Sequence, residues 1–135
     1  MAGFKSDYLC DALLDHEMGA TVWTAPATIY IAAFTAAPTS SGGGTEVTGG
    51  SYARVALTNN GTNFPAAASK TKRTGVAITF PSPSADWGSI VGLASFDAAS
   101  GGNMLRYGPL STPVTVTSGG AALSIPSQGG IFTEA

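Results

Sequence analysis

The sequence offers few residues whose types and spacing could support catalysis. It contains one histidine, His16, and one cysteine, Cys10, the pair that a nucleophile and its base would use. Both fall in a predicted helix, and six steps of about 100° place them about 120° apart, on different faces. A dyad within that helix is therefore excluded. Serine and threonine are too common in the predicted turns to single out another nucleophile, and a triad on the same histidine is disfavoured.

The carboxylates after residue 20 give little support to a general acid and base. Asp86 precedes Trp87, and Asp97 opens the run DAASGG, which ends in Gly101 and Gly102. An aspartate ahead of glycines typically accepts backbone hydrogen bonds in a turn. We therefore predict that Asp97, Gly101 and Gly102 form a structural turn. We expect Asp86 to have a turn or cap role rather than a proton-transfer role.

Metal and cofactor binding are also unsupported. Asp11, Asp15 and His16 come nearest to a ligand set, since the i, i+4 spacing puts two carboxylates on one helix face. A solvated acidic face accounts for that spacing without a metal ion. The single cysteine excludes an internal disulfide and a multi-cysteine zinc cluster. We predict no cofactor, no metal site and no enzymatic activity.

A glycine-rich stretch, GTEVTGGSYARVAL (residues 44–57), could cradle a phosphate. A phosphate loop closes with GK[ST] and leads into a helix. Here Gly49 and Gly50 lead instead into an alternation of apolar residues that is typical of a strand. We therefore predict that both glycines form a structural turn and that Arg54 is a lone strand charge. Its expected carboxylate partner is Glu46, Asp86 or Asp97.

Carbohydrate binding has some support from the aromatic residues. Ring faces for a sugar could come from Trp23, Trp87, Tyr30, Tyr52 or Tyr107. An aromatic content of 9% is ordinary, however, and rings beside β-branched residues more often fill a core. A sugar-binding module is therefore an alternative, which predicts that Trp87→Ala abolishes glycan binding without unfolding the chain.

Composition limits the partners. The chain has 135 residues, 44% hydrophobic and 10% charged, with a formal net charge of −2, whereas about 25% of residues are charged in an ordinary soluble protein. This charge offers no drive toward nucleic acid or an anionic membrane. No run approaches the roughly 18 apolar residues of a membrane span, and acidic residues stand where a secretory signal would be apolar. We expect one soluble domain, made in the cytoplasm and packed against partners.

The elements that position these residues begin with a helix predicted over Phe4–Met18. Ser6 or Asp7 can cap its first turn, and Gly19 can end it. Its apolar stripe consists of Tyr8, Leu9, Ala12 and Leu13. Its acidic stripe consists of Asp7, Asp11 and Asp15. One face is therefore expected to pack and another to be solvated.

The rest of the chain follows the two-residue period of strands. Thr28–Phe34 is apolar enough on both sides to be a central strand. The other predicted strands are Ala53–Leu57, Gly75–Phe80, Ile90–Phe96, Met104–Gly108, Pro113–Val116, Ala121–Ile125 and Ile131–Thr133. We predict a mainly β protein, an antiparallel β-sandwich of jelly-roll or Ig-like type, with one short N-terminal α-helix. The expected division is a helical arm at residues 1–20 and a single β-sandwich domain at 21–135.

Four segments, taken in order, resemble a known family. They are YLCDALLDH (8–16), PATIYIAAFT (26–35), GTEVTGGSYARVAL (44–57) and ITFPSPSADWGSIVGLASFDAASGGNMLRYGPL (78–110). The arrangement resembles small virion proteins of tailed bacteriophages, often catalogued as tail-fibre or minor tail proteins. The resemblance spans about residues 8–116 and implies a non-enzymatic structural role in the virion, with no catalytic residues to carry over. The segment 59–73 is longer and more polar than the family pattern, which implies a contact particular to this phage.

Two placements in the virion follow from the resemblance. A capsid cement or decoration protein would bind the major capsid protein and stabilise the shell. A tail, tail-fibre or baseplate component would bind other virion proteins and help the phage attach to its host. We favour the capsid, because the chain is one short domain without the repeats or heptads of a fibre shaft. Host glycan is a partner only in the alternatives.

Interfaces are expected because virion symmetry implies repeated copies, and hence a homo-oligomer. The helix is one candidate docking arm, although the same stripe could pack on its own sandwich. The basic cluster KTKR is a second candidate, and the alternative is a solvated loop or strand end. The predicted interface residues are Phe4, Tyr8 and Leu13 on the helix and Lys70, Lys72 and Arg73 in the cluster.

Overall fold

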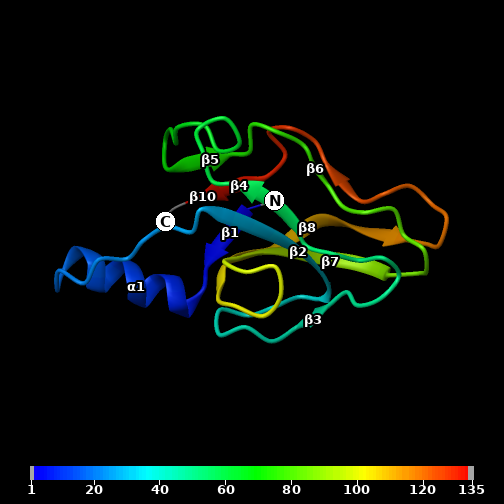
Figure 1. The fold of residues 1–135 in the computed structure, drawn as a ribbon, viewed down its shortest axis with the longest axis horizontal. Helices are drawn as coiled ribbons and strands as arrows, with labels where there is room; N and C mark the ends of the chain where they lie inside the picture. Colours follow the sequence, from blue (N-terminus) through cyan, green and yellow to red (C-terminus); the bar gives the residue numbers. More distant parts are fainter. Residues whose placement is uncertain (1, 134–135) are drawn as a thin grey trace.

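Ten strands and one helix form the described part of the chain, residues 2–133 of a computed structural model (Figure 1). In chain order they are β1 (Ala2–Lys5), α1 (Asp7–Glu17), β2 (Thr28–Ala36), β3 (Thr45–Glu46), β4 (Val55–Thr58), β5 (Thr71–Arg73), β6 (Ile78–Thr79), β7 (Gly88–Phe96), β8 (Met104–Val116), β9 (Ser124–Ile125) and β10 (Ile131–Thr133). The prediction of a mainly β protein with one short helix near its N-terminus is confirmed.

A large sheet contains most of the strands. Its order is β3-β2-β7-β8-β1-β10-β5, and β4 pairs with the first half of β2 while β3 pairs with the second half. The pairs are antiparallel, except that β1 and β10 run parallel. β6 and β9 form a separate antiparallel pair. The prediction of antiparallel sheets is thus confirmed, with sheets of very unequal size.

The main core lies between the large sheet and the β6–β9 pair. Ile31 of β2, Leu93 of β7 and Ile78 of β6 belong to one buried cluster. Beside them the ring of Phe80 stacks on Tyr52, with centroids 6.2 Å apart. Burying large apolar side chains from two layers against each other is the main stabilising contribution in a sandwich.

Strand β2 is apolar on both faces, as the sequence predicts for Thr28–Phe34. Ile31 and Ala33 point into the main core, whereas Ala32 and Phe34 belong to a second cluster. The other buried members of this second cluster are Ala94, Phe96 and Met104. The loops before β3 and after β7 lie over this face (Figure 1). Loops, which carry most recognition sites, are therefore placed against a rigid apolar surface.

Helix α1 begins three residues later than predicted, because Phe4 and Lys5 belong to a strand. They pair with Tyr107 and Arg106 of β8. Ser6, one of the two predicted caps, is the N-cap, and its Oγ accepts a hydrogen bond from the backbone N–H of Leu9 at 3.2 Å. The predicted division into a helical arm (1–20) and a β domain (21–135) stays a prediction. Residues 2–5, which that division assigns to the arm, form β1 and belong to the large sheet.

Other strand boundaries also differ from prediction. Two expected strands, Met104–Gly108 and Pro113–Val116, are one long strand, β8. Its pairing with β7 shifts between Ile90 and Gly92, where residues 110–113 form an irregularity. β3 and β5 were not predicted, since two or three residues carry too little periodicity to identify a strand.

Candidate functional site

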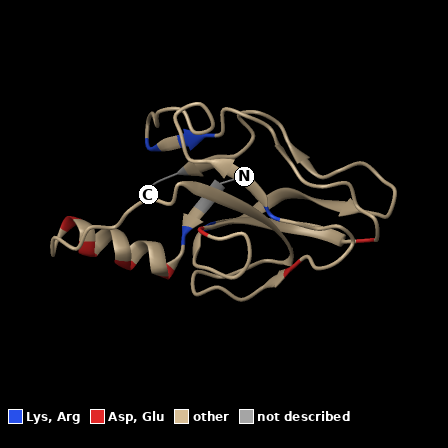
Figure 2. Ribbon diagram, viewed as in Figure 1, with Lys and Arg blue, Asp and Glu red and all other residues tan. Residues whose placement is uncertain are grey.

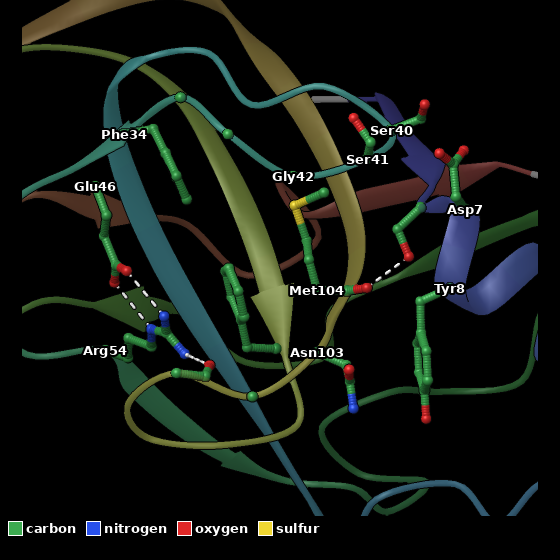
Figure 3. Close-up of a pocket in the computed structure, with 16 residues that line it drawn as sticks. Asp7, Tyr8, Phe34, Ser40, Ser41, Gly42, Glu46, Arg54, Asn103 and Met104 are labelled. Carbon is green, nitrogen blue, oxygen red and sulfur yellow. Dashed lines mark hydrogen bonds and ion pairs between the residues drawn. The ribbon is translucent and has the colours of Figure 1, made fainter.

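Arg54 joins two glycine-rich segments, GTEVTGG (44–50) and DAASGG (97–102), on which the resemblance to phage virion proteins rests. Its Nε and Nη2 donate to the two carboxylate oxygens of Glu46, both at 2.8 Å. Its Nη1 donates to the carbonyls of Ala98 at 2.8 Å and Gly101 at 2.9 Å. Figure 3 shows the guanidinium between the carboxylate and the loop after β7. The sequence predicts Glu46, Asp86 or Asp97 as the carboxylate partner of Arg54, and the structure confirms Glu46.

Tyr52 completes this group, which we call the arginine clamp: Arg54, Glu46, Tyr52 and the two carbonyls. The Tyr52 hydroxyl donates to Glu46 at 2.7 Å and accepts from the backbone N–H of Ala33 at 3.0 Å. The guanidinium carbon also lies 3.8 Å from the ring centroid of Phe96, a cation–π contact. The clamp therefore ties the β3–β4 connection and the β7–β8 loop to the large sheet.

The charges of the clamp are mutually stabilised. Burial acts to raise the pKa of Glu46, but hydrogen bonds from Arg54 and Tyr52 outweigh it and hold that pKa below its ordinary value. The hydrogen bond to Glu46 raises the pKa of Arg54. Burial, together with the Glu46 carboxylate, raises the pKa of Tyr52. Glu46 is thus held as a carboxylate paired with Arg54. This state suits a structural role and not the role of a general acid.

Gly49 and Gly50 lie in a turn between β3 and β4, with φ of +72° and +60°. The carbonyl of Gly50 accepts from the indole Nε1 of Trp87 at 2.9 Å and from the backbone N–H of Ser84 at 3.0 Å. Trp87 is only 6% exposed. Its proposed role as a sugar platform that can be removed without unfolding is wrong, because the ring fills the core.

The two aspartates of the β region accept backbone hydrogen bonds. Asp97 accepts from the backbone N–H of Asn103 at 2.7 Å and from its side-chain amide at 3.0 Å. Gly101 and Gly102 lie within this turn at φ of +61° and +73°. Asp86 accepts from the backbone N–H of Ser118 at 2.7 Å. Both carboxylates therefore fix loop geometry.

The helix residues considered for chemistry have local roles. His16 Nδ1 accepts from the backbone N–H of Trp23 at 3.2 Å, and Cys10 is a half-buried free thiol. Within residues 2–133, no group of three or more His, Cys, Asp or Glu is placed to hold a metal ion. In the part of the chain that the structure describes, no helix is long and apolar enough to cross a membrane.

A pocket of about 550 Å³ adjoins the arginine clamp, and we call it the loop pocket (Figure 3). Phe34, Phe96 and Met104 form its apolar floor. Residues 40–44, residues 101–103 and the start of α1 form its walls, and the clamp closes one side. An apolar floor with convergent polar groups is typical of a ligand site. Sequence reasoning missed this pocket, since its parts are far apart in the chain.

A second cavity of about 380 Å³ lies between α1 and the sheet, and we call it the lysine groove. Its large apolar lining residues are Leu9, Leu13, Trp23, Ile29, Phe64, Leu105 and Phe132. Lys70 and Lys72 line it as well. In the described part of the chain, neither lysine pairs with a carboxylate. The groove is therefore apolar with a cationic border.

Three of the six predicted interface residues meet in the lysine groove: Leu13, Lys70 and Lys72. Tyr8 lies instead at the loop pocket and is 41% exposed. Phe4 is 56% exposed, with its ring 5.8 Å from Tyr107. That these residues contact a partner stays a prediction.

Arg73, the sixth predicted interface residue, is separated from the groove. It lines another cavity, with Gln128, whose carbonyl accepts from Arg73 Nη1 at 3.3 Å. Neighbouring residues of a strand point to opposite faces, so Lys72 and Arg73 face different surfaces. The basic cluster is thus divided between two sites.

Two segments of opposite charge lie in separate parts of the ribbon (Figure 2). The exposed acids of α1 are Asp7, Asp11, Asp15 and Glu17. The bases of the 70–73 segment lie in or next to β5, away from the helix acids in Figure 2. These two segments, which have opposite charge, hold half of the chain's charged residues.

Comparison with protein-family models identifies the chain as a structural protein of the bacteriophage virion. The matching model is described as Podophage GP4 fiber I protein gp80, and it matches residues 5–131. The chain belongs to this family. The resemblance to small phage virion proteins is therefore confirmed, over a longer range than the sequence segments indicated. A search of curated proteins finds no match.

Proposed function

We propose that the chain is a non-enzymatic structural subunit of the phage fibre, assembled into the virion after synthesis in the host cytoplasm. The observation that carries the proposal is the match of residues 5–131 to a family described as a fibre protein. On sequence alone, the short chain without shaft repeats favours the capsid placement over the fibre. However, a short unit is equally compatible with an end or attachment piece of a fibre made from several chains.

The positions of the polar residues support a structural role. Glu46, Tyr52 and Arg54 satisfy one another within the arginine clamp. Asp97 and Asp86 hold loops through backbone hydrogen bonds. Groups that could otherwise act as acids, bases or anion ligands are thus used to fix loops on the sheet.

The loop pocket supports a role in host attachment. A sugar ring could lie against its apolar floor. The Tyr8 hydroxyl and the side-chain carbonyl of Asn103, whose Nδ2 donates to Asp97, offer hydrogen bonds at the wall. Host glycan is therefore the proposed ligand, at this pocket and not at Trp87. The test is a glycan array with wild type, Tyr8→Ala and the exposed control Phe4→Ala. Loss in Tyr8→Ala alone supports this site, and absence of wild-type binding contradicts it.

Counting copies per particle tests the placement. Quantitative mass spectrometry of purified phage should give a few dozen copies or fewer for a fibre subunit. The capsid cement prediction, with the major capsid protein as partner, requires hundreds of copies, because the shell repeats its subunits many times. Hundreds of copies would therefore contradict the fibre proposal.

A further inference from the structure

We propose that the outward face of α1 in one copy docks into the lysine groove of a second copy. The outward face consists of Asp7, Asp11, Leu14, Asp15 and Met18. This inference goes beyond the fibre assignment, because it names the partner and the two surfaces, and it holds wherever the subunit lies in the particle.

The lysine groove defines what its partner must look like. Its wall is mostly apolar, and apolar surface in contact with water favours burial. Lys70 is exposed and Lys72 half-buried, and in the described range neither has a carboxylate partner. A fitting partner therefore carries apolar side chains at its centre and carboxylates beside them.

The outward face of α1 has this pattern. Leu14 is 52% exposed and Met18 is 71% exposed. At about 100° per residue, Leu14 lies about 60° from Asp11 and about 100° from Asp15 around the helix. Leu9 lies about 160° from Asp11 by the same geometry, and it is buried against the chain's own sheet. The helix thus packs through one face and leaves an apolar and acidic face unused.

The distribution of charge favours a second copy over other occupants. Only 10% of residues are charged, yet half of these lie in α1 or the 70–73 segment. Each copy therefore carries both halves of a complementary pair, and docking would bring opposite charges together. A nucleic acid or anionic membrane at the groove would also face α1, since Leu9 and Leu13 of that helix line the groove, and the four carboxylates of the helix would repel it.

Two assemblies can use this contact. A reciprocal exchange, helix to groove in both directions, makes a twofold dimer. A one-way repeat makes a ring or an open chain. Both bury the same surfaces, so the same substitutions test both.

The test is sedimentation equilibrium of the full-length chain with paired charge reversals. Asp11→Lys/Asp15→Lys makes the helix face basic, and Lys70→Glu/Lys72→Glu makes the groove acidic. Each variant alone should self-associate at least about tenfold more weakly, since reversal replaces attraction with repulsion at each pair. An equimolar mixture should associate again, because a basic helix then meets an acidic groove. Arg73→Glu, a single charge reversal on the opposite face of β5, should leave association unchanged.

The apolar half of the contact has its own variant. Leu14→Asp is expected to weaken association without unfolding the chain, because Leu14 is largely exposed; far-ultraviolet circular dichroism checks the fold. Monomeric wild type at high concentration overturns the proposal. So does a mixture of the two reversed variants that fails to associate, or an Arg73→Glu effect as large as that of Lys70→Glu/Lys72→Glu.

Discussion

Replacing Arg54 by methionine removes the guanidinium of the arginine clamp and keeps an apolar stem against Phe96. The Arg54 side chain is 6% exposed, and it donates two hydrogen bonds to Glu46 and one each to the carbonyls of Ala98 and Gly101. Breaking a buried ion pair from one side costs about 3–5 kcal/mol. We expect about 3 kcal/mol, the low end of that range, because the Glu46 side chain is 25% exposed and water can reach it.

Urea unfolding followed by circular dichroism measures this loss, and thermal unfolding should show a Tm about 10 °C lower. Arg73→Met, which removes an exposed guanidinium, is the matched control and should change stability by less than about 0.5 kcal/mol. The double variant Arg54→Met/Glu46→Gln should be more stable than the two single losses predict, by about 1–3 kcal/mol. An Arg54→Met variant as stable as its control, or additive single losses, would refute the clamp as a stabilising unit.

Three further changes test other parts of the structure. The stability advantage of wild type over Glu46→Gln, measured by urea titration, should be full above pH 4.5, the ordinary pKa of glutamate. It should shrink as the pH falls below that value, because the pKa of Glu46 is depressed in the folded state. A stability advantage that persists in acid would contradict this. Gly50→Ala should cost about 2 kcal/mol or more, because its Cβ would lie 2.8 Å from Trp87 Nε1 at φ +60°. Gly49→Ala is the control, with φ of +72° and no atom within 4 Å of its Cβ, and it should cost about 1 kcal/mol. Equal losses of stability in Gly50→Ala and Gly49→Ala, measured by thermal unfolding, would count against the close contact of Gly50 with Trp87. Ser6→Ala should cost about 1 kcal/mol by removing the helix cap and should speed hydrogen exchange in the first turn of α1; unchanged exchange there would argue against the cap.

Local patterns in the sequence predicted the parts of the fold that depend on neighbouring residues. Ser6 was recognised as a possible cap because its side chain can reach the N–H groups of the first turn. The central place of β2 followed from apolar residues on both of its faces. The pairing of Arg54 with Glu46 was one of three possibilities, and only the fold brings the loop after β7 close enough to supply the remaining acceptors.

Features that depend on distant segments could not be read from the sequence. β1 looked like the start of a helix, because nothing near Phe4 indicates that it pairs with Tyr107. The loop pocket and the lysine groove are likewise assembled from segments far apart in the chain. Trp87 could be a core residue or a surface platform by type alone, and only its burial against Phe80 decides between them.

A cryo-electron microscopy reconstruction of the whole phage particle, with residues 2–133 fitted to the density, tests the fibre assignment most directly. We predict that the fold, recognisable by α1 at the end of the large sheet, fits density in the fibres. A fit to density repeated over the capsid shell, with none in the fibres, would contradict the proposed function.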